Sequence, residues 1–209
     1  MNHLVLLGDS IFDNASYVNK DEAVINHLLN SIPSDFQVSL LAVDGDITSD
    51  VHNQLKKLPN DTTHLIISCG GNDALRAAHL LEKPAKTVAE AMSLFAGIKS
   101  EFQAQYHSML AAAKKRSKKI TVCTIYNSVP TITPGALTAL AIYNDAILAE
   151  AFSIGVPVID LRLTCNDAQD YSPISPIEPS KQGGLKISER IIDVITSHDF
   201  HHLKSSIYY

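Results

Sequence analysis

The residues that point most directly to chemistry follow the first apolar run of the chain, Leu4 to Leu7, as Gly8, Asp9 and Ser10. In a parallel α/β sheet, ligands bind outside the carboxyl ends of the strands, so Ser10 stands where a nucleophile is expected. Serine is also a favoured first residue of a helix, and this second interpretation of Ser10 requires no catalysis. The triplet alone leaves both interpretations open.

Glycines and short polar residues also follow the next two apolar runs. Gly45 stands between two aspartates after the second run, and Asn72 and Asp73 follow two glycines after the third. Glycine lets backbone N–H groups approach a ligand closely, and asparagine adds a side-chain donor. Together with the Ser10 hydroxyl, these groups could form a nucleophile and an oxyanion hole. An oxyanion hole is the set of donors that stabilises the negative oxygen of a tetrahedral intermediate. The same residue types are also common in ordinary turns.

The elements that must position these residues alternate between short apolar runs and longer amphipathic segments, which is typical of a parallel sheet covered by helices on both faces. The predicted strands are His3 to Leu7, Gln37 to Val43, His64 to Cys69, Ile120 to Ile125 and Val156 to Asp160. The predicted helices are Asp21 to Asn30, Thr48 to Leu58, Thr87 to Lys115, Gly135 to Ile154 and Gly183 to Ser197. A length of 209 residues with 45% hydrophobic residues predicts a single domain over residues 1–209.

The predicted helix Thr87 to Lys115 has the clearest periodicity, because apolar side chains recur in it at intervals of three or four residues. These side chains are Val88, Met92, Phe95, Ile98, Phe102, Tyr106 and Met109. We expect the whole stripe to pack against the sheet, and the alternative is a surface for a partner.

Composition excludes several classes of protein. A net charge of −5 argues against a nucleic-acid or anionic-membrane partner, since both normally bind a positive surface. No uninterrupted apolar stretch is long enough to predict a membrane span. Cys69, Cys123 and Cys165 are odd in number and lie in or near apolar runs, so we expect buried thiols and a cytoplasmic location. The oligomeric state is not fixed by the sequence.

Three blocks of residues resemble a known family. GDSIFDN at Gly8 to Asn14, Gly45, and GGND at Gly70 to Asp73 look like the first three motif blocks of the SGNH hydrolases, also called the GDSL esterase and lipase family. The resemblance covers most of the chain and implies a flavodoxin-like three-layer α/β/α sandwich with a five-stranded parallel sheet. It implies that Ser10 is the nucleophile, and that the Ser10 and Gly45 N–H groups and the Asn72 side chain form the oxyanion hole.

The last block of the family departs from its pattern here. The family has an aspartate and, three residues later, a histidine, where this chain has Ser175 and Glu178. No histidine lies between His107 and His198, and the histidines from His198 onward follow a helix that carries them about 20 Å from the expected site. His79 lies on the correct edge of the sheet and is a second candidate, with surface solvation as its alternative.

Glu178 has two competing interpretations. Burial raises the pKa of a carboxyl group, which makes a glutamate a better base near neutral pH. Pairing with Arg162 would instead lower that pKa and make Glu178 an anchor for its loop. Asp160 is placed to orient either Glu178 or Arg162. We expect Asp9 and Asp73 to support the site. Asp9 should hold the turn and cap the first helix.

The sequence therefore predicts a serine hydrolase that cleaves carboxylic esters, acyl or acetyl, through an acyl-Ser10 intermediate, with Glu178 in place of the usual histidine. The expected partner is a small-molecule ester. No cluster has metal-ligand spacing and no phosphate-binding glycine motif follows the first strand, so we predict no metal and no cofactor. The first alternative is a catalytically weak or inactive binding protein on the SGNH fold. A weaker alternative is a flavodoxin-like binder of phosphate or flavin.

Overall fold

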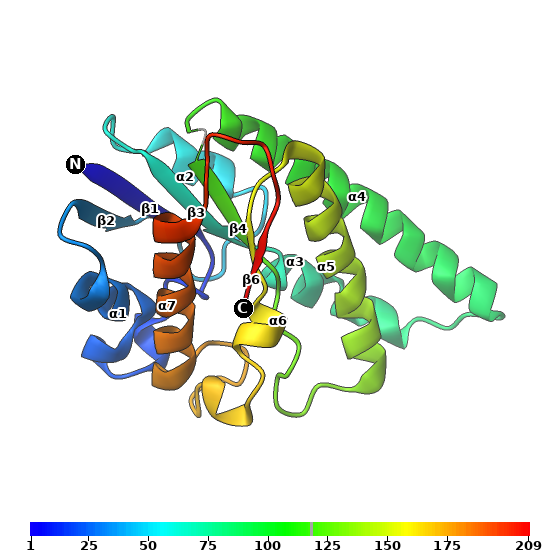
Figure 1. The fold of residues 1–209 in the computed structure, drawn as a ribbon. Coiled ribbons are helices and arrows are strands. Elements are labelled where there is room, and N and C mark those ends of the chain that lie inside the picture. Colours follow the sequence, from blue (N-terminus) through cyan, green and yellow to red (C-terminus); the bar gives the residue numbers. More distant parts are fainter. Residues whose placement is uncertain (118) are drawn as a thin grey trace.

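The computed structural model describes residues 1–117 and 119–209, apart from the side chain of Lys20. Its centre is a six-stranded sheet in the order β2-β1-β3-β4-β5-β6, with every neighbouring pair parallel (Figure 1). The strands are β1 (Asn2–Gly8), β2 (Phe36–Leu40), β3 (His64–Ser68), β4 (Lys119–Cys123), β5 (Val158–Ile159) and β6 (Ile207–Tyr208). The first five follow the flavodoxin-like order, which confirms the predicted fold class.

Helices cover both faces of the sheet. They are α1 (Val24–Ser31), α2 (Val51–Lys56), α3 (Gly71–Ala77), α4 (Val88–Lys114), α5 (Pro134–Ile154), α6 (Leu161–Thr164) and α7 (Lys181–Ser197). Short 3-10 helices are η1 (Ala15–Tyr17), η2 (Lys20–Glu22), η3 (Ala78–Glu82) and η4 (Ala168–Asp170). The α1 and α7 side chains pack on one face with Leu4 and Leu6, and α2, α4 and α5 pack on the other with Val5 and Leu7. Because successive strand residues alternate between faces, β1 alone contributes to both cores.

A sixth strand was not predicted. β6 is only two residues long, and it pairs beside β5 at the edge of the sheet. The backbone N–H groups of Val158 and Asp160 donate to the carbonyls of Ser206 and Tyr208 at 2.8 Å. Two residues are too short to show strand periodicity, so the pairing depends on contacts between distant segments.

The apolar stripe of α4 is only partly in the core. Phe102, Tyr106 and Met109 are buried against the sheet and α5, whereas Val88 and Met92 are exposed. In Figure 1 the amino-terminal half of α4 extends past the body of the molecule. The prediction that the whole stripe packs against the sheet is therefore wrong for its first turns.

Helix α5 is long and apolar enough to cross a membrane by length and composition alone. Core helices of globular proteins pass the same test, and α5 contributes Tyr143, Ile147 and Ala151 to the same core as α4. The absence of a membrane span stays a prediction. All three cysteines are buried and free, and the cytoplasmic location likewise stays a prediction.

Candidate active site

Ser10 is held in a tight turn at the carboxyl end of β1. Gly8 has φ +125°, and a Cβ atom there would lie 1.7 Å from the Ser68 carbonyl oxygen, so only glycine fits this position. The next N–H, that of Asp9, donates to the same carbonyl at 3.1 Å. Ser10 follows with only 7% of its surface exposed, and it lines a cavity. No helix begins at Ser10, because the next helical elements, η1 and α1, start at Ala15 and Val24, so the helix-cap interpretation of Ser10 is wrong.

Asp9 holds the turn but does not cap the first helix. Its Oδ1 atom accepts the N–H of Ile11 at 3.1 Å, two residues along the chain. The N–H of Val24, at the start of α1, instead donates to Oδ1 of Asn14 at 3.0 Å. The first half of the expectation for Asp9 is confirmed and the second half is wrong.

Glu178 lies beside Ser10. The Ser10 hydroxyl donates to Oε1 of Glu178 at 3.3 Å, and Glu178 is buried with 4% of its surface exposed. Its other oxygen, Oε2, is also buried and has no hydrogen-bond partner among the described residues. A carboxylate oxygen facing a serine hydroxyl is the geometry that a proton acceptor needs.

A short, well-anchored loop presents Glu178. The N–H of Glu178 donates to the Ser175 carbonyl at 3.2 Å, and its carbonyl accepts from the N–H of Ser172 at 2.8 Å. The Asn14 amide donates to the Pro179 carbonyl at 3.1 Å, which ties this loop to the turn that carries Ser10. Ser180 then caps α7 by accepting the N–H of Gly183 at 3.2 Å. Hydrogen bonds of both its N–H and its carbonyl therefore fix Glu178 within the loop.

Burial controls the ionisation of the acidic groups around Ser10. It raises the pKa of Glu178, while hydroxyl groups of Ser175 and Ser10 act in the opposite direction. Burial raises the pKa of Asp9 to about 7, against the Ile11 N–H and with help from the charges of Asp73 and Glu178. The pKa of Asp73 is also raised by burial, although Thr48 donates to its carboxylate at 3.0 Å from both N and Oγ1. These carboxyl groups therefore hold protons more strongly than free ones.

The three predicted oxyanion donors lie at the ends of β1, β2 and β3. The N–H groups of Ser10 and Gly45 have no acceptor in the part of the chain that the structure describes. The Asn72 amide donates one hydrogen to the Asp46 carbonyl at 2.9 Å, which leaves the second hydrogen for a ligand. Ser10 and Asn72 line the cavity, and Gly45 is on the exposed loop next to Asp46, with φ +83°.

The Gln54 side chain connects the ends of β1 and β2 by hydrogen bonds, and no motif in the sequence identifies it. Its side chain is buried, accepts the Gly8 N–H at 2.8 Å and donates to the Gly8 carbonyl at 2.7 Å. The same amide donates to Oδ2 of Asp46 at 2.8 Å. Gln54 therefore fixes the loop that carries Gly45 relative to the turn that carries Ser10, as Asn14 fixes the Glu178 loop.

A cavity of about 310 Å³ opens at Ser10. Its polar lining includes Asp9, Ser10, Asn72 and Glu178, all at one end of the sheet. Most of the remaining lining is apolar and comes from α3, η3, α4, α5 and the loops at residues 125–132 and 176–178. An apolar cavity with a few convergent polar groups is the usual form of a small-molecule site.

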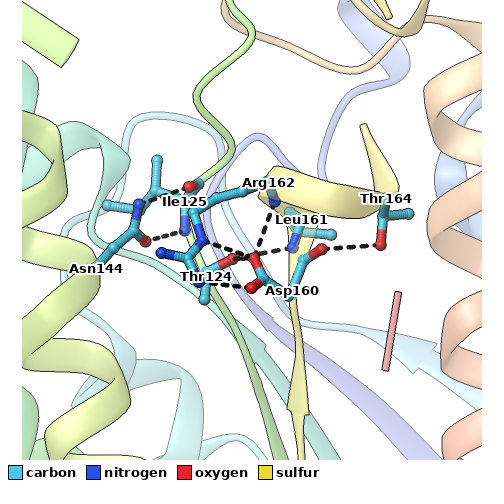
Figure 2. Close-up of polar contacts among 7 residues, drawn as sticks. All are labelled: Thr124, Ile125, Asn144, Asp160, Leu161, Arg162 and Thr164. Carbon is cyan, nitrogen blue, oxygen red and sulfur yellow. Dashed lines mark hydrogen bonds and ion pairs between the residues drawn. The ribbon is translucent and has the colours of Figure 1, made fainter. Parts of the chain in front are cut away.

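Asp160 and Arg162 pair with each other rather than with the site (Figure 2). Arg162 donates from Nε to Oδ1 of Asp160 at 2.8 Å and from its terminal nitrogen to Oδ2 at 2.6 Å. Thr124 also donates to Asp160 at 2.8 Å. Burial raises the pKa of Asp160, but the bonds from Arg162 and Thr124 outweigh it and lower that pKa overall. The pairing of Arg162 with Glu178 is therefore wrong, since the Arg162 guanidinium is committed to Asp160.

No histidine lines the cavity among the described residues. His79 is exposed, and its Nδ1 contacts the carbonyl of Arg76 at 2.9 Å, so the ring lies outside the lining. The described residues also contain no group of three His, Cys, Asp or Glu side chains with metal-binding geometry. The absence of a metal or cofactor stays a prediction.

Comparison with known proteins finds a matching family and several similar solved structures. The model of the GDSL-like lipase/acylhydrolase family matches residues 6–183. Among solved structures, an extracellular lipase of Streptomyces rimosus is 17% identical, with a TM-score of 0.68 over 95% of this chain and 100% of that one. A lipolytic G-D-S-L protein of Veillonella parvula is 14% identical, with a TM-score of 0.72 over 95% and 100%.

A third similar structure is an acetyl xylan esterase variant of Geobacillus stearothermophilus, which is 14% identical with a TM-score of 0.68 over 93% of this chain and 94% of that one. At such identities the structures establish a shared fold and no more. A search of curated protein sequences found no significant match.

Proposed function

The chain belongs to the GDSL-like lipase/acylhydrolase family and is an ester hydrolase, and we propose that its nucleophile is Ser10 and its base is Glu178. The observation that carries the proposal is the hydrogen bond of 3.3 Å from the Ser10 hydroxyl to Oε1 of a buried carboxylate. Nucleophilic catalysis by serine requires such an acceptor, because the hydroxyl is a weak nucleophile until its proton is removed.

In the proposed acylation step, Ser10 Oγ attacks the ester carbonyl carbon while its proton passes to Glu178. The N–H groups of Ser10 and Gly45 and the free hydrogen of the Asn72 amide stabilise the negative carbonyl oxygen. Glu178 then returns the proton to the alcohol oxygen as the carbon–oxygen bond breaks. An acyl-Ser10 ester and a free alcohol result.

Deacylation repeats these steps with water. A water molecule gives a proton to Glu178 as its oxygen attacks the acyl carbon. The second tetrahedral intermediate then expels Ser10 Oγ, which takes the proton back from Glu178. The products are the carboxylic acid and the regenerated Ser10 hydroxyl, so one water is consumed for each ester cleaved.

The environment supports a carboxylate in this role. Burial raises the pKa of Glu178, and a more basic carboxylate accepts a serine proton more readily. The pKa of Asp9, at about 7, keeps that neighbouring carboxyl largely neutral below pH 7. A neutral Asp9 adds no negative charge to the cavity in which the oxyanion forms, so the rate should be highest where Glu178 is ionised and Asp9 is protonated.

The size and the lining of the cavity support substrates with acyl chains longer than acetyl. It offers about 310 Å³, and most of its lining is apolar. At about 30 Å³ for each water-sized group, that volume holds on the order of ten such groups, whereas an acetyl methyl fills one. Burial of each further methylene contributes about 0.8 kcal/mol, so a longer chain binds more tightly until the cavity is full.

The second candidate function is a binding protein with little or no turnover. The observation that favours it is the absence of a histidine from the described lining of the cavity. Such a protein would retain acyl esters in the cavity without cleaving them.

Turnover of aryl esters separates the two functions. The wild-type protein and Ser10→Ala are incubated with p-nitrophenyl esters of two to twelve carbons between pH 5 and 9. The proposal expects hydrolysis that increases from acetyl to medium chains and is lost in Ser10→Ala. Binding of a chain-length series without any release of nitrophenol would instead support the binding protein.

A further inference from the structure

One carboxyl oxygen in the wall of the cavity is left without a partner. It is Oδ2 of Asp9, a residue that lines the cavity and is 3% exposed. The other oxygen, Oδ1, accepts the Ile11 N–H at 3.1 Å, whereas Oδ2 has no hydrogen-bond partner among the described residues. Oδ2 is not fully enclosed, so it is open to the cavity. A polar atom that is nearly buried and still unpaired requires an explanation.

Gly71, at the start of α3, leaves the space in front of this oxygen open. A Cβ atom at position 71 would lie 3.8 Å from Oδ2 of Asp9 and 4.0 Å from Cγ2 of Ile125. Both are ordinary van der Waals distances, so a carbon-sized atom fits between these groups. Gly71 and Ile125 line the cavity, as Asp9 does. We call the space between the three residues the Asp9 corner.

The walls of the Asp9 corner are held in place before any ligand enters. Asn144, buried on α5, accepts the Ile125 N–H at 2.7 Å and donates to the Ile125 carbonyl at 2.8 Å (Figure 2). On the other side of the corner, the bond from the Ile11 N–H fixes the Asp9 carboxyl group. A preformed polar contact of this kind discriminates between ligands because little is lost in ordering it.

The bond from Ile11 also decides which oxygen of a neutral Asp9 donates. Oδ1 is the acceptor in that bond, so the proton of the neutral carboxyl group resides on Oδ2 and points into the cavity. Burial raises the pKa of Asp9 to about 7, which keeps the carboxyl group largely neutral below pH 7. In that range the Asp9 corner offers one O–H donor.

The ionisable groups around Asp9 are acidic. The groups whose charges act on Asp9, or on which its charge acts, are Asp73, Glu178, Cys69, Cys123, Tyr106 and Tyr126. Burial raises the pKa of both thiols and both phenols, so these four stay neutral. Arg76 acts on Asp73 and lowers its pKa. An ionised Asp9 would add to the negative charge and repel an electron-rich ligand atom, whereas a neutral Asp9 binds one.

We propose that Oδ2 of Asp9 selects esters whose acyl group carries a hydrogen-bond-accepting oxygen, such as an ether or keto oxygen, a few bonds from the ester carbonyl. This inference rests on the proposed function and names its substrate class. Asp9 precedes Ser10 and Gly71 precedes Asn72, so the Asp9 corner lies beside the place where the carbonyl would bind. A hydrocarbon chain there displaces water and leaves the donor unpaired, whereas an oxygen replaces the water.

The test uses two pairs of p-nitrophenyl esters that differ at one position. Methoxyacetate has an ether oxygen where butanoate has a methylene, and 4-oxopentanoate has a keto oxygen where 4-methylpentanoate has a methyl group. Each kcat/KM is divided by the rate of hydrolysis of the same ester by hydroxide, which removes its inherent reactivity. The oxygen preference is the resulting ratio of the oxygenated ester to its hydrocarbon partner. It is measured at pH 6 and pH 8.5.

The effect of pH on the oxygen preference reports the donor. We expect the preference of the wild type to be about tenfold greater at pH 6 than at pH 8.5 in at least one pair, because Asp9 loses the donated proton between them. Asp9→Asn should retain the preference at both pH values. Its amide oxygen accepts the Ile11 N–H, which leaves the amide N–H groups at the position of Oδ2.

Two glycine variants test the place of the contact. Gly71→Ala should lower the oxygen preference at pH 6, because the added methyl group occupies the Asp9 corner. The control is Gly97→Ala on α4, another glycine within a helix, where an added Cβ has nothing within 4 Å and lies outside the cavity lining. Its preference should equal that of the wild type, and thermal unfolding confirms that each variant is folded.

Three results would overturn the proposal. They are a wild-type oxygen preference that is the same at both pH values in both pairs, a preference that Asp9→Asn loses at pH 6, and a preference that Gly71→Ala leaves unchanged. Any of them with full cleavage of the hydrocarbon esters contradicts the role of Asp9 and leaves the proposed function intact.

Binding to Ser10→Ala separates the failure of the two proposals. This variant lacks the proposed nucleophile, so the dissociation constant of each ester is measured without turnover. A wild type that cleaves no ester contradicts the proposed function. If Ser10→Ala then binds the oxygenated esters more tightly at pH 6 than at pH 8.5, relative to their partners, the role of Asp9 is supported; equal ratios would contradict it as well.

Discussion

Two serines of this protein have acid–base partners. Ser39 is on β2, in register with Val5 in the middle of β1, and Ser10 follows the carboxyl end of β1. Ser39 Oγ contacts Nε2 of His3 at 2.8 Å, and Nδ1 of the same ring contacts Asp61 at 2.8 Å. This is the order of groups in a serine–histidine–aspartate triad. Ser10 has the carboxylate of Glu178 as its acid–base partner. Partner chemistry alone would select Ser39 as the nucleophile.

The surroundings of the two serines reverse that choice. The cavity at Ser10 includes the proposed base, Glu178, and the proposed oxyanion donor of Asn72, whereas none of the Ser39, His3 and Asp61 side chains lines it. The Asp61 side chain is 65% exposed, so solvent screens its charge. A triad of side chains is therefore insufficient to define a site; a cavity for the substrate and donors for the oxyanion are needed as well.

Exchange of each serine for alanine gives the largest expected contrast. Ser10→Ala should lower kcat/KM for a medium-chain aryl ester by on the order of 10³-fold or more, because it removes the proposed nucleophile. Ser39→Ala should leave the same rate unchanged. Steady-state kinetics on the two purified variants measures both, and a loss in Ser39→Ala with full activity in Ser10→Ala would invert the assignment.

Removal of the charge at Glu178 should have the next largest effect. Glu178→Gln retains the size of the side chain but accepts no proton, so we expect kcat to fall by roughly 10² to 10⁴-fold. The matched control is Glu150→Gln, at a buried carboxylate that contacts Gln103 and His107 between α4 and α5. Equal rates in wild type and Glu178→Gln would remove Glu178 from the mechanism and leave Ser10 without an assigned base.

The pH profile distinguishes a carboxylate base from an imidazole base. The rate should rise as Glu178 ionises, at a pH above the ordinary glutamate value of 4.5 because burial raises its pKa. It should fall again near pH 7 as Asp9 ionises in the same cavity. The kcat/KM of the wild type is measured from pH 4 to 9, and Asp9→Asn should lose the alkaline decline. A rate that rises through pH 7 to a plateau is typical of an imidazole base and would contradict the account.

Asp9 should also make the stability of the fold depend on pH. Its carboxyl has a pKa of about 7 when folded and 3.8 in its ordinary state, so the folded protein holds a proton that the unfolded chain releases. The stability contributed by this group is present below pH 3.8 and is lost as the pH rises to about 7. Asp9→Asn should therefore raise Tm more at pH 8 than at pH 4 in differential scanning fluorimetry. An equal change in Tm at both pH values would show that Asp9 is not protonated in the fold.

The smallest expected effect is structural and concerns Ser39. Ser39→Ala leaves Nε2 of the buried His3 without its hydrogen-bond partner, which should cost about 1 kcal/mol of unfolding free energy. Urea denaturation of the variant measures this loss. A Ser39→Ala protein with unchanged stability would show that water replaces the hydroxyl.

The sheet and the nucleophile turn could be predicted from local pattern. Buried parallel strands appear as short apolar runs, and the glycine at position 8 marks a turn that admits no side chain. Glu178 could be placed near Ser10 because the motif order aligned its segment with the family's last block. Gln54 and Asn14 could not, since each acts through bonds to residues 46 and 165 positions away.

Two expectations failed because they depended on what lies opposite a residue. The period of α4 shows which of its faces is apolar but not how far the sheet extends beneath it, so Val88 and Met92 were wrongly placed in the core. Pairing with Arg162 was one of two interpretations of Glu178, whereas Asp160, two residues before Arg162, accepts both arms of its guanidinium. Periodicity shows that a helix face needs an apolar partner, and charge shows that a side chain needs an opposite charge. Only the fold determines which residue fills that role.

Labelling with a fluorophosphonate tests the central claim most directly, because the reagent bonds to an activated serine whatever the preferred ester. The wild type, Glu178→Gln and Ser39→Ala are labelled over time, and the modified peptide is located by mass spectrometry. The account predicts a label on Ser10 alone, at the same rate in Ser39→Ala and much more slowly in Glu178→Gln. A label on Ser39, or no label on Ser10 at any pH from 5 to 9, would contradict it.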